Sequence, residues 1–328
     1  MGLPFRRKAL KTAALLGLLL LLGLAAGTWV LQREWSREAF GGYDPALPLE
    51  PEVATLSGSL PFRTEQVTIT GLKGERLPLR LFVPETAKKP VPCVVLLYGI
   101  GQKMSFFDRI APIFAEHGVA LALPEQYEQG VRRPPGRSPY RRVKGFHLRS
   151  SRIVPETRRV VDYLVSRPEI DPGRLHLLGV SYGGIMSSAV LAHEPRLRSG
   201  SLIMAGGNLR ALLNVLATHY NPGGEWQNAV ACGMLARWFD VFEPLRYIGS
   251  VAPRPLLFLN VEKDELIPRS STAALYNAAR EPKAQRWYPD VHETISRATV
   301  RAMLTDALEW MAAQEGAEHA VATGRTGD

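Results

Sequence analysis

The apolar residues of this chain gather in short runs that are separated by longer stretches with helical spacing. The short runs have the length and character of buried strands, and they lie at residues 65–70, 77–83, 91–98, 119–123, 175–180, 202–205, 255–260 and 285–288. Helical patterns occur between them, at residues 104–117, 154–166, 271–279 and 295–313. Strands that alternate with helices predict an α/β fold, with a mostly parallel sheet covered by helices on both faces. A turn at residues 71–74 joins the first two strands, which we expect to form a hairpin.

One strand, turn and helix in the middle of the chain suggest chemistry. The apolar run Leu175–Val180 leads into Gly179-Val-Ser181-Tyr-Gly183, and a helix of small residues follows. A G-x-S-x-G sequence between a strand and a helix is typical of a nucleophile elbow, in which the serine sits on a strained turn with its hydroxyl exposed. The elbow glycines, Gly179 and Gly183, would remove side chains that otherwise clash. Ser181 is therefore a candidate nucleophile.

A serine hydroxyl needs a base to take its proton and a carboxylate to orient that base. Asp264 lies a few residues beyond the carboxyl end of the strand at 255–260, and Glu262 and Glu265 compete with it for the role of orienting carboxylate. His292 follows the last predicted strand and precedes the last helix. The order serine, aspartate, histidine matches that of elbow-type hydrolases. We therefore expect a triad of Ser181, Asp264 and His292.

Acyl transfer also requires hydrogen-bond donors for the oxyanion that develops in the transition state. One donor would be the backbone N–H of Tyr182, the residue after the nucleophile. The second would come from the glycine-containing loop at residues 98–102, where the Ile100 N–H can point inward. A simple tight turn is the alternative interpretation of that loop.

These motifs resemble those of the α/β-hydrolase superfamily, within it the dienelactone-hydrolase-like and prolyl-oligopeptidase-like serine esterases and peptidases. The resemblance covers residues 62–313 and implies an α/β-hydrolase fold in which Ser181 is the nucleophile, His292 the general base and acid, and Asp264 its orienter. Two positions depart from the family pattern. Tyr98-Gly99 stands where the family often has His-Gly, and Asp290-Val291-His292 stands where it has Gly-Gly-His.

The expected function is that of a serine hydrolase of the carboxylesterase type, which cleaves a small-molecule ester through an acyl-serine intermediate. No cluster of residues has the spacing of metal ligands, so no metal or cofactor is expected. A serine peptidase or an acyltransferase could use the same triad. A non-catalytic binding module on a hydrolase fold is the alternative from a different class.

Two segments interrupt the alternation of strands and helices. Residues 208–250 carry two helical patterns, and they form either a lid over the elbow or additional core packing. Residues 131–149 are rich in basic side chains, namely Arg132, Arg133, Arg137, Arg141, Arg142, Lys144 and Arg149. This second segment is either a solvated loop or a surface for anionic lipid headgroups or an acidic substrate. Nucleic acid is not expected, because no aromatic platform accompanies the charges.

The N-terminal segment, residues 1–35, has the pattern of a membrane signal-anchor. The net charge of the chain is +9, and part of the excess precedes the uncharged stretch 12–32, which is long enough to span a bilayer. Trp29 and Trp35 would suit the membrane interface. The catalytic domain would then lie on the periplasmic or extracellular side. A cleaved signal, with small residues at 25–27, would instead give a secreted protein, and the basic cluster also resembles a twin-arginine signal.

The remaining parts of the chain complete the expected organisation. Residues 36–61 contain several prolines and are predicted to be an extended linker. Residues 62–313 would form the hydrolase domain, and residues 314–328 a disordered tail. Cys93 lies within a predicted strand and Cys232 within a predicted helix, so we expect two unpaired cysteines in apolar surroundings.

Overall fold

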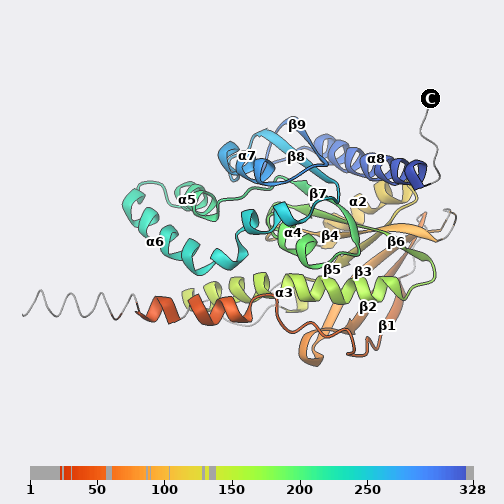
Figure 1. The fold of residues 1–328 in the computed structure, drawn as a ribbon, viewed down its shortest axis with the longest axis horizontal. Coiled ribbons are helices and arrows are strands. Elements are labelled where there is room, and N and C mark those ends of the chain that lie inside the picture. Colours follow the sequence, from red (N-terminus) through yellow and green to blue (C-terminus); the bar gives the residue numbers. More distant parts are fainter. Residues whose placement is uncertain are drawn as a thin grey trace, which may run out of the picture.

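The computed structural model describes residues 23, 26–30, 32–56, 61–85, 88, 90–102, 104–127, 130–132 and 138–322. Within them, nine strands form one sheet (Figure 1). Across the sheet the order is β1 (Glu52–Leu56), β2 (Phe62–Thr70), β3 (Arg76–Pro84), β5 (Ala120–Pro124), β4 (Val91–Leu97), β6 (Ile170–Val180), β7 (Leu197–Ile203), β8 (Leu256–Lys263) and β9 (Lys283–Val291). In this order, the pairs from β1 to β5 are antiparallel, and the pairs from β5 to β9 are parallel. The predicted mostly parallel sheet and the β2–β3 hairpin are both confirmed.

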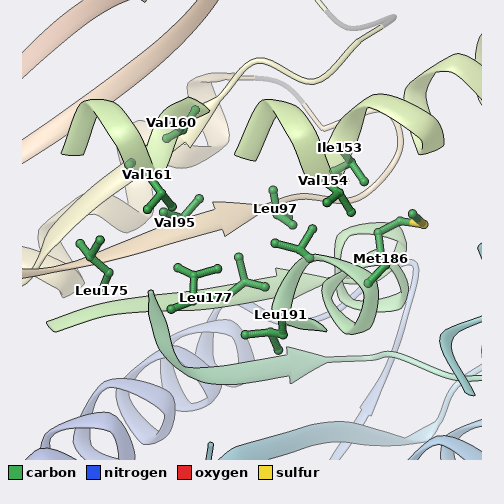
Figure 2. Packing of buried hydrophobic residues seen from close by; sticks show 14 of the residues in the cluster. Val95, Leu97, Ile153, Val154, Val160, Val161, Leu175, Leu177, Met186 and Leu191 are labelled. Atoms are coloured by element: carbon green, nitrogen blue, oxygen red, sulfur yellow. The ribbon is translucent and has the colours of Figure 1, made fainter. Parts of the chain in front are cut away.

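Helices cover both faces of the sheet. They are α2 (Met104–Glu116), α3 (Pro139–Val165), α4 (Tyr182–His193), α5 (Leu209–Tyr220), α6 (Glu225–Trp238), α7 (Arg269–Ala278) and α8 (Arg297–Ala322). Strands β4 and β5, in the middle of the sheet, have no polar side chains because alternate side chains enter opposite apolar layers. In β4, Val95 packs in the layer that includes α3, α4 and α7, whereas Leu96 packs in the layer that includes α2 and α8. Figure 2 shows the first layer, where Leu177 of β6 packs in one cluster with Val161 of α3 and Leu191 of α4.

Helix α3 begins much earlier than the apolar pattern predicted. Its first residue is Pro139, and Ser138 caps it by accepting a hydrogen bond from the Arg141 N–H at 3.3 Å. The second half of the basic segment 131–149 is therefore helix rather than loop. Arg132 is also not solvated, because its guanidinium pairs with Glu156 of α3.

The other arginines of this segment differ in their surroundings. Arg149 is buried and donates to Gln126. The side chains of Arg141 and Arg142 are exposed, whereas Arg133 and Arg137 lie outside the described residues. A solvated loop or a lipid-binding surface is thus the wrong interpretation for Arg132 and Arg149, which are buried with hydrogen-bond partners.

The N-terminal residues 26–30 and 32–38 are helical, and this helix runs beside α3 (Figure 1). Trp35 is only 7% exposed and stacks on His147 of α3 with ring centroids 4.1 Å apart, so its predicted place at a membrane interface is wrong. Most of the stretch 12–32, on which the signal-anchor expectation rests, lies outside the described residues. In the part of the chain that the structure describes, no helix has the length and apolarity needed to cross a bilayer.

Residues 36–56, the described part of the expected linker apart from Pro61, pack on the domain. Strand β1 extends the sheet by pairing with β2. The buried guanidinium of Arg159 in α3 donates to the carbonyl oxygens of Asp44, Leu47 and Pro48 at 2.8–3.3 Å. A buried arginine requires such acceptors, which explains why this proline-containing segment is held against α3.

The end of the chain also differs from the expectation. Helix α8 continues to Ala322, although residues 314–328 were expected to be disordered. Glu315 accounts for part of this extension, because it hydrogen-bonds His176 of β6 at 2.7 Å and Arg174 at 2.7 Å. Cys93 and Cys232 are free and buried, as predicted. Burial raises the pKa of the Cys93 thiol far above its usual range.

Candidate active site

Ser181 lies on the turn between β6 and α4, with φ 54° and ψ −118°. This backbone conformation is strained for a residue with a side chain, as the elbow sequence predicts. A Cβ at Gly183 would overlap the carbonyl group of Leu97 in β4, and a Cβ at Gly179 would overlap Ser187 of α4. Both glycines are therefore required for β4, β6 and α4 to approach closely enough to hold the turn.

The structure brings the three predicted side chains together at the carboxyl edge of the parallel strands. Nε2 of His292 lies 2.9 Å from Oγ of Ser181, and Nδ1 lies 2.9 and 3.0 Å from the two carboxylate oxygens of Asp264. In a neutral imidazole, Nδ1–H donates to Asp264 and Nε2 accepts from the Ser181 hydroxyl. The imidazole and the carboxylate are both less than 10% exposed, with side-chain exposures of 8% and 7%. These two side chains are thus largely shielded from water.

Backbone groups fix the orientation of the Asp264 carboxylate. Oδ1 accepts hydrogen bonds from the N–H groups of Leu266 and Ile267, at 3.0 and 2.7 Å. The acid in contact with His292 is Asp264, and neither Glu262 nor Glu265 takes that position.

Glu265 has a different task, which the sequence analysis missed. Its two carboxylate oxygens accept hydrogen bonds from the backbone N–H groups of His292 and Glu293, at 2.9 and 2.7 Å. Burial pushes the pKa of Glu265 upward, but these two N–H donors outweigh burial and lower it. An ionised Glu265 thus holds the loop that carries His292 through two hydrogen bonds. The only signal in the sequence was its position next to Asp264, which was interpreted as competition for the same role.

The two predicted oxyanion donors lie on segments that flank Ser181. Tyr182 is the first residue of α4, at the positive end of the helix dipole. Gly99 approaches the nucleophile so closely that a Cβ there would lie 3.4 Å from Cβ of Ser181. The next residue, Ile100, exposes 62% of its surface and lines the same cavity.

A series of contacts between buried polar side chains connects the loop at residues 98–102 with the start of α4. The carbonyl of Tyr98 accepts from Nε2 of Gln126 at 3.0 Å, and Oε1 of Gln126 accepts from Nε of Arg149 at 3.0 Å. The Arg149 guanidinium lies 4.4 Å from the ring centroid of Tyr182, and the Tyr182 hydroxyl lies 3.0 Å from the Ser150 hydroxyl. Through Gln126, Arg149 therefore connects the loop at residues 98–102 to the first residue of α4. No local pattern in the sequence indicated this role, because the partners are far apart in the chain.

Side-chain hydrogen bonds stabilise both departures from the family pattern. Tyr98, which replaces the common histidine, is buried, and its hydroxyl accepts the Gln126 N–H at 3.2 Å. Asp290, which replaces a glycine before the histidine, accepts from the N–H groups of Val291 and Ser296 at 2.8 and 3.0 Å. Side-chain hydrogen bonds of Tyr98 and Asp290 thus stabilise these two loops.

A cavity of about 800 Å³ opens beside Ser181 and His292. Its lining contains side chains from both layers of the fold, with Phe107 of α2 and Met303 of α8 on one side and Phe146 of α3 on the other. Most of the remaining lining residues are also apolar. The arrangement can therefore enclose a mainly hydrocarbon molecule next to the serine hydroxyl.

The segment 208–250, called the cap below, contains α5 and α6 (Figure 1). Several of its side chains line this cavity. The leucines of the first predicted stripe, Leu209, Leu212, Leu213 and Leu216, all line the cavity. Glu243 fastens the start of α5 by accepting from the N–H groups of Asn208 and Leu209. Tyr220, at the end of α5, donates to Glu293 beside the active histidine loop at 2.9 Å. Movement of this cap as a lid stays a prediction.

The sheet order, the elbow and the position of the cap define an α/β-hydrolase. The sequence profile of the prolyl oligopeptidase family matches residues 150–314, and that of the dienelactone hydrolase family matches residues 77–210. The chain belongs to the prolyl oligopeptidase family, and it is a hydrolase of the type that also includes the dienelactone hydrolases. The superfamily predicted from the elbow and from the order of the site residues is thereby confirmed.

Related proteins and structures agree with this assignment. The uncharacterized protein YfhR of Salmonella typhi is 27% identical over 236 residues, which cover 71% of this chain and 75% of YfhR. Among solved structures, acetyl xylan esterase 1 from Thermoanaerobacterium sp. JW/SL YS485 has a TM-score of 0.59 at 19% identity and covers 83% of this chain and 92% of its own. The acetyl xylan esterase from Paenibacillus sp. R4 has a TM-score of 0.62 at 17% identity, with 86% and 92% covered. At these identities the two structures establish the fold alone.

Proposed function

We propose that this protein cleaves carboxylic esters through an acyl-serine intermediate, with Ser181, His292 and Asp264 as its catalytic triad. The observation that carries the proposal is the continuous chain of hydrogen bonds from Asp264 through His292 to Ser181, at 2.9–3.0 Å. An unbroken chain of this kind supports a working hydrolase over a binding module, because it has the geometry that proton transfer requires.

In the first half of the reaction, Nε2 of His292 takes the proton of the Ser181 hydroxyl while Oγ attacks the ester carbonyl carbon. Negative charge then develops on the former carbonyl oxygen, and the N–H groups of Tyr182 and Ile100 stabilise it. Each such donor lowers the activation barrier by on the order of 3 kcal/mol. His292 next gives its proton to the departing alkoxide, and the alcohol leaves. Asp264 holds the Nδ1–H throughout and stabilises the imidazolium.

In the second half, a water molecule repeats the sequence on the acyl-serine. His292 takes a proton from the water as the water oxygen attacks the acyl carbon. The tetrahedral intermediate collapses, the bond between Oγ of Ser181 and the acyl carbon breaks, and the hydroxyl recovers its proton from His292. The carboxylic acid then leaves the cavity.

The cavity supports an ester in preference to a peptide. A peptide substrate brings several amide N–H and C=O groups, and each one that is buried without a partner costs roughly 1–3 kcal/mol. Gln102 is the one side-chain amide among the described residues that line the cavity. An ester linkage has no N–H to satisfy, so it enters such a cavity at lower cost.

The test is labelling of the purified full chain with a small fluorophosphonate, together with turnover of p-nitrophenyl esters and of a peptide p-nitroanilide. We expect labelling and ester turnover in the wild type, and loss of both in Ser181→Ala, with turnover falling on the order of 10⁴-fold or more.

Ser188→Ala is the matched control, because Ser188 is a buried serine of α4, the helix that follows Ser181, and its hydroxyl has no hydrogen-bond partner in the described structure. This variant should keep wild-type labelling and turnover. A folded wild-type protein that is not labelled, or equal turnover in Ser181→Ala, would contradict the proposal.

A further inference from the structure

The leucines of α5 form one wall of the cavity beside Ser181. Leu209, Leu212, Leu213 and Leu216 all line it, and the distance along the helix from the first to the last is seven residues, or about 10 Å. An extended hydrocarbon chain advances about 1.25 Å per carbon along its zigzag of 1.5 Å bonds. A chain of roughly eight carbons therefore matches the length of this wall.

The cavity lining has few charged side chains, so its interior does not suit an ionic substrate. Among the described residues that border the cavity, Arg142 and Glu293 are the only Arg, Lys, Asp or Glu. Arg142 and Glu293 are both exposed to solvent. A carboxylate or ammonium group held deep in the cavity would lack a partner, which is strongly unfavourable. The interior accordingly suits an uncharged, apolar group.

The size of the cavity exceeds what a short acyl group needs. A cavity of about 150 Å³ already holds a six-carbon ring such as benzene, whereas this one has about 800 Å³. An acetyl group would leave most of that space without contacts. A long chain would fill it, and each methylene transferred from water contributes to binding.

We propose that the natural substrate is an ester with a long unbranched hydrocarbon chain, of roughly eight carbons or more, that lies along the leucines of α5. This inference rests on the proposed function, because it assigns the substrate class of the same site. The chain can belong to the acid or to the alcohol of the ester, and the chemistry of recognition is the same in both cases.

The experiment measures kcat/KM of the full chain for two series of esters below their micelle-forming concentrations. In one series the acyl chain of a p-nitrophenyl ester grows from acetate to dodecanoate, and in the other the alcohol of an acetate ester grows over the same range. We expect kcat/KM to rise by up to about fourfold per methylene, the equivalent of about 0.8 kcal/mol, in at least one series. From two to eight carbons the chain gains six methylenes, and even about twofold for each would raise kcat/KM about sixtyfold, which we take as the smallest expected rise.

Leu213→Trp places a large side chain into the α5 wall, and Asn214→Trp is its control on the same helix, because Asn214 is exposed and does not line the cavity. In Leu213→Trp the ratio of long-chain to short-chain kcat/KM should fall at least tenfold. Asn214→Trp should keep the wild-type ratio. If Leu213→Trp does not fold, the wild-type profiles alone decide.

Fluorophosphonate labelling separates this inference from the proposed function. A wild-type protein that is labelled and hydrolyses short esters, but shows flat or falling profiles beyond four carbons in both series, would overturn the substrate class and leave the serine hydrolase intact. A profile that rises in either series and is flattened by Leu213→Trp supports the proposal. Absence of labelling in folded wild-type protein would remove the proposed function, and the substrate class with it.

Discussion

Helix α4, which follows the nucleophile elbow, and helix α6 of the cap both border the cavity, but the protein covers them to very different extents. Nine of the twelve residues of α4 are buried, against two of the fourteen residues of α6. On α6, Trp226, Val230 and Met234 are largely exposed although they are apolar. Almost every position of α4 is thus constrained by neighbours, whereas most positions of α6 are free of such constraints.

This difference in burial shows that the elbow and the cap, which border the same cavity, meet different structural requirements. The elbow must hold Ser181 in a strained turn, and strain persists only where the surroundings determine the backbone fully. The cap has to provide an apolar wall, which α5 does with a few leucines, and its outer surface contributes little to that task. Segments with few buried contacts open at low free-energy cost, so we expect the cap to be less stable locally than the elbow.

The largest effect on the elbow side should come from Gly183→Ala. Alanine is the better helix former, but its Cβ would overlap the Leu97 carbonyl, so β4 and α4 would have to separate. We expect the free energy of unfolding to fall by about 3 kcal/mol and fluorophosphonate labelling of Ser181 to be lost. Urea unfolding and labelling measure the two quantities. An unchanged free energy of unfolding would show that the elbow tolerates movement, and the contrast with the cap would fail.

The elbow side is also where the sequence predicted most. The sheet, the hairpin, the elbow and the residues that meet at Ser181 follow from local apolar patterns and from the order of residues along the chain. The predicted roles of these residues stay predictions. The sequence could not show that Arg149 and Gln126 connect the loop at residues 98–102 to α4, or that Glu265 holds the loop of His292, because these contacts join distant segments.

The errors have the same physical origin. The sequence indicates a loop over the first half of α3, because its arginines interrupt the apolar pattern, although Arg149 is buried with a polar partner. The sequence suggests a membrane interface for Trp35, because the apolar run continues toward it, whereas tertiary packing buries Trp35 against His147. Burial by pairing or by stacking leaves no periodic signal in the sequence.

His147 lies where the cap joins the buried core, and it should give an intermediate effect. It is enclosed by Trp35, Phe239 and Phe242, and this burial lowers its pKa to about 4. In the unfolded chain the pKa is about 6.5, so the unfolded state binds more protons below that pH and stability falls as pH decreases from about 6.5 toward 4. Between pH 7 and pH 5 the wild type should lose about 2 kcal/mol through this residue.

His147→Phe keeps an aromatic ring in the same place and removes the titrating group. Urea unfolding at pH 7 and pH 5 should therefore show a smaller loss of stability in the variant, by about 2 kcal/mol. Other groups that titrate in this range affect both proteins equally and cancel in the difference. Equal losses in wild type and variant would mean that the base of the cap admits water or a proton, and that it resembles the exposed part of α6 rather than the core.

The smallest effect, and one of opposite sign, should come from Gly233→Ala in α6. A Cβ at Gly233 would meet no atom within 4 Å. Glycine within a helix costs about 0.5–1 kcal/mol relative to alanine, so the variant should be more stable by up to that amount, with unchanged ester turnover. The same substitution in two helices that border one cavity would then destabilise α4 and stabilise α6. If unfolding of the cap precedes global unfolding, the gain should appear in hydrogen exchange of α6 and not in the global transition. A loss of stability in Gly233→Ala would show that α6 is constrained by contacts like those of α4.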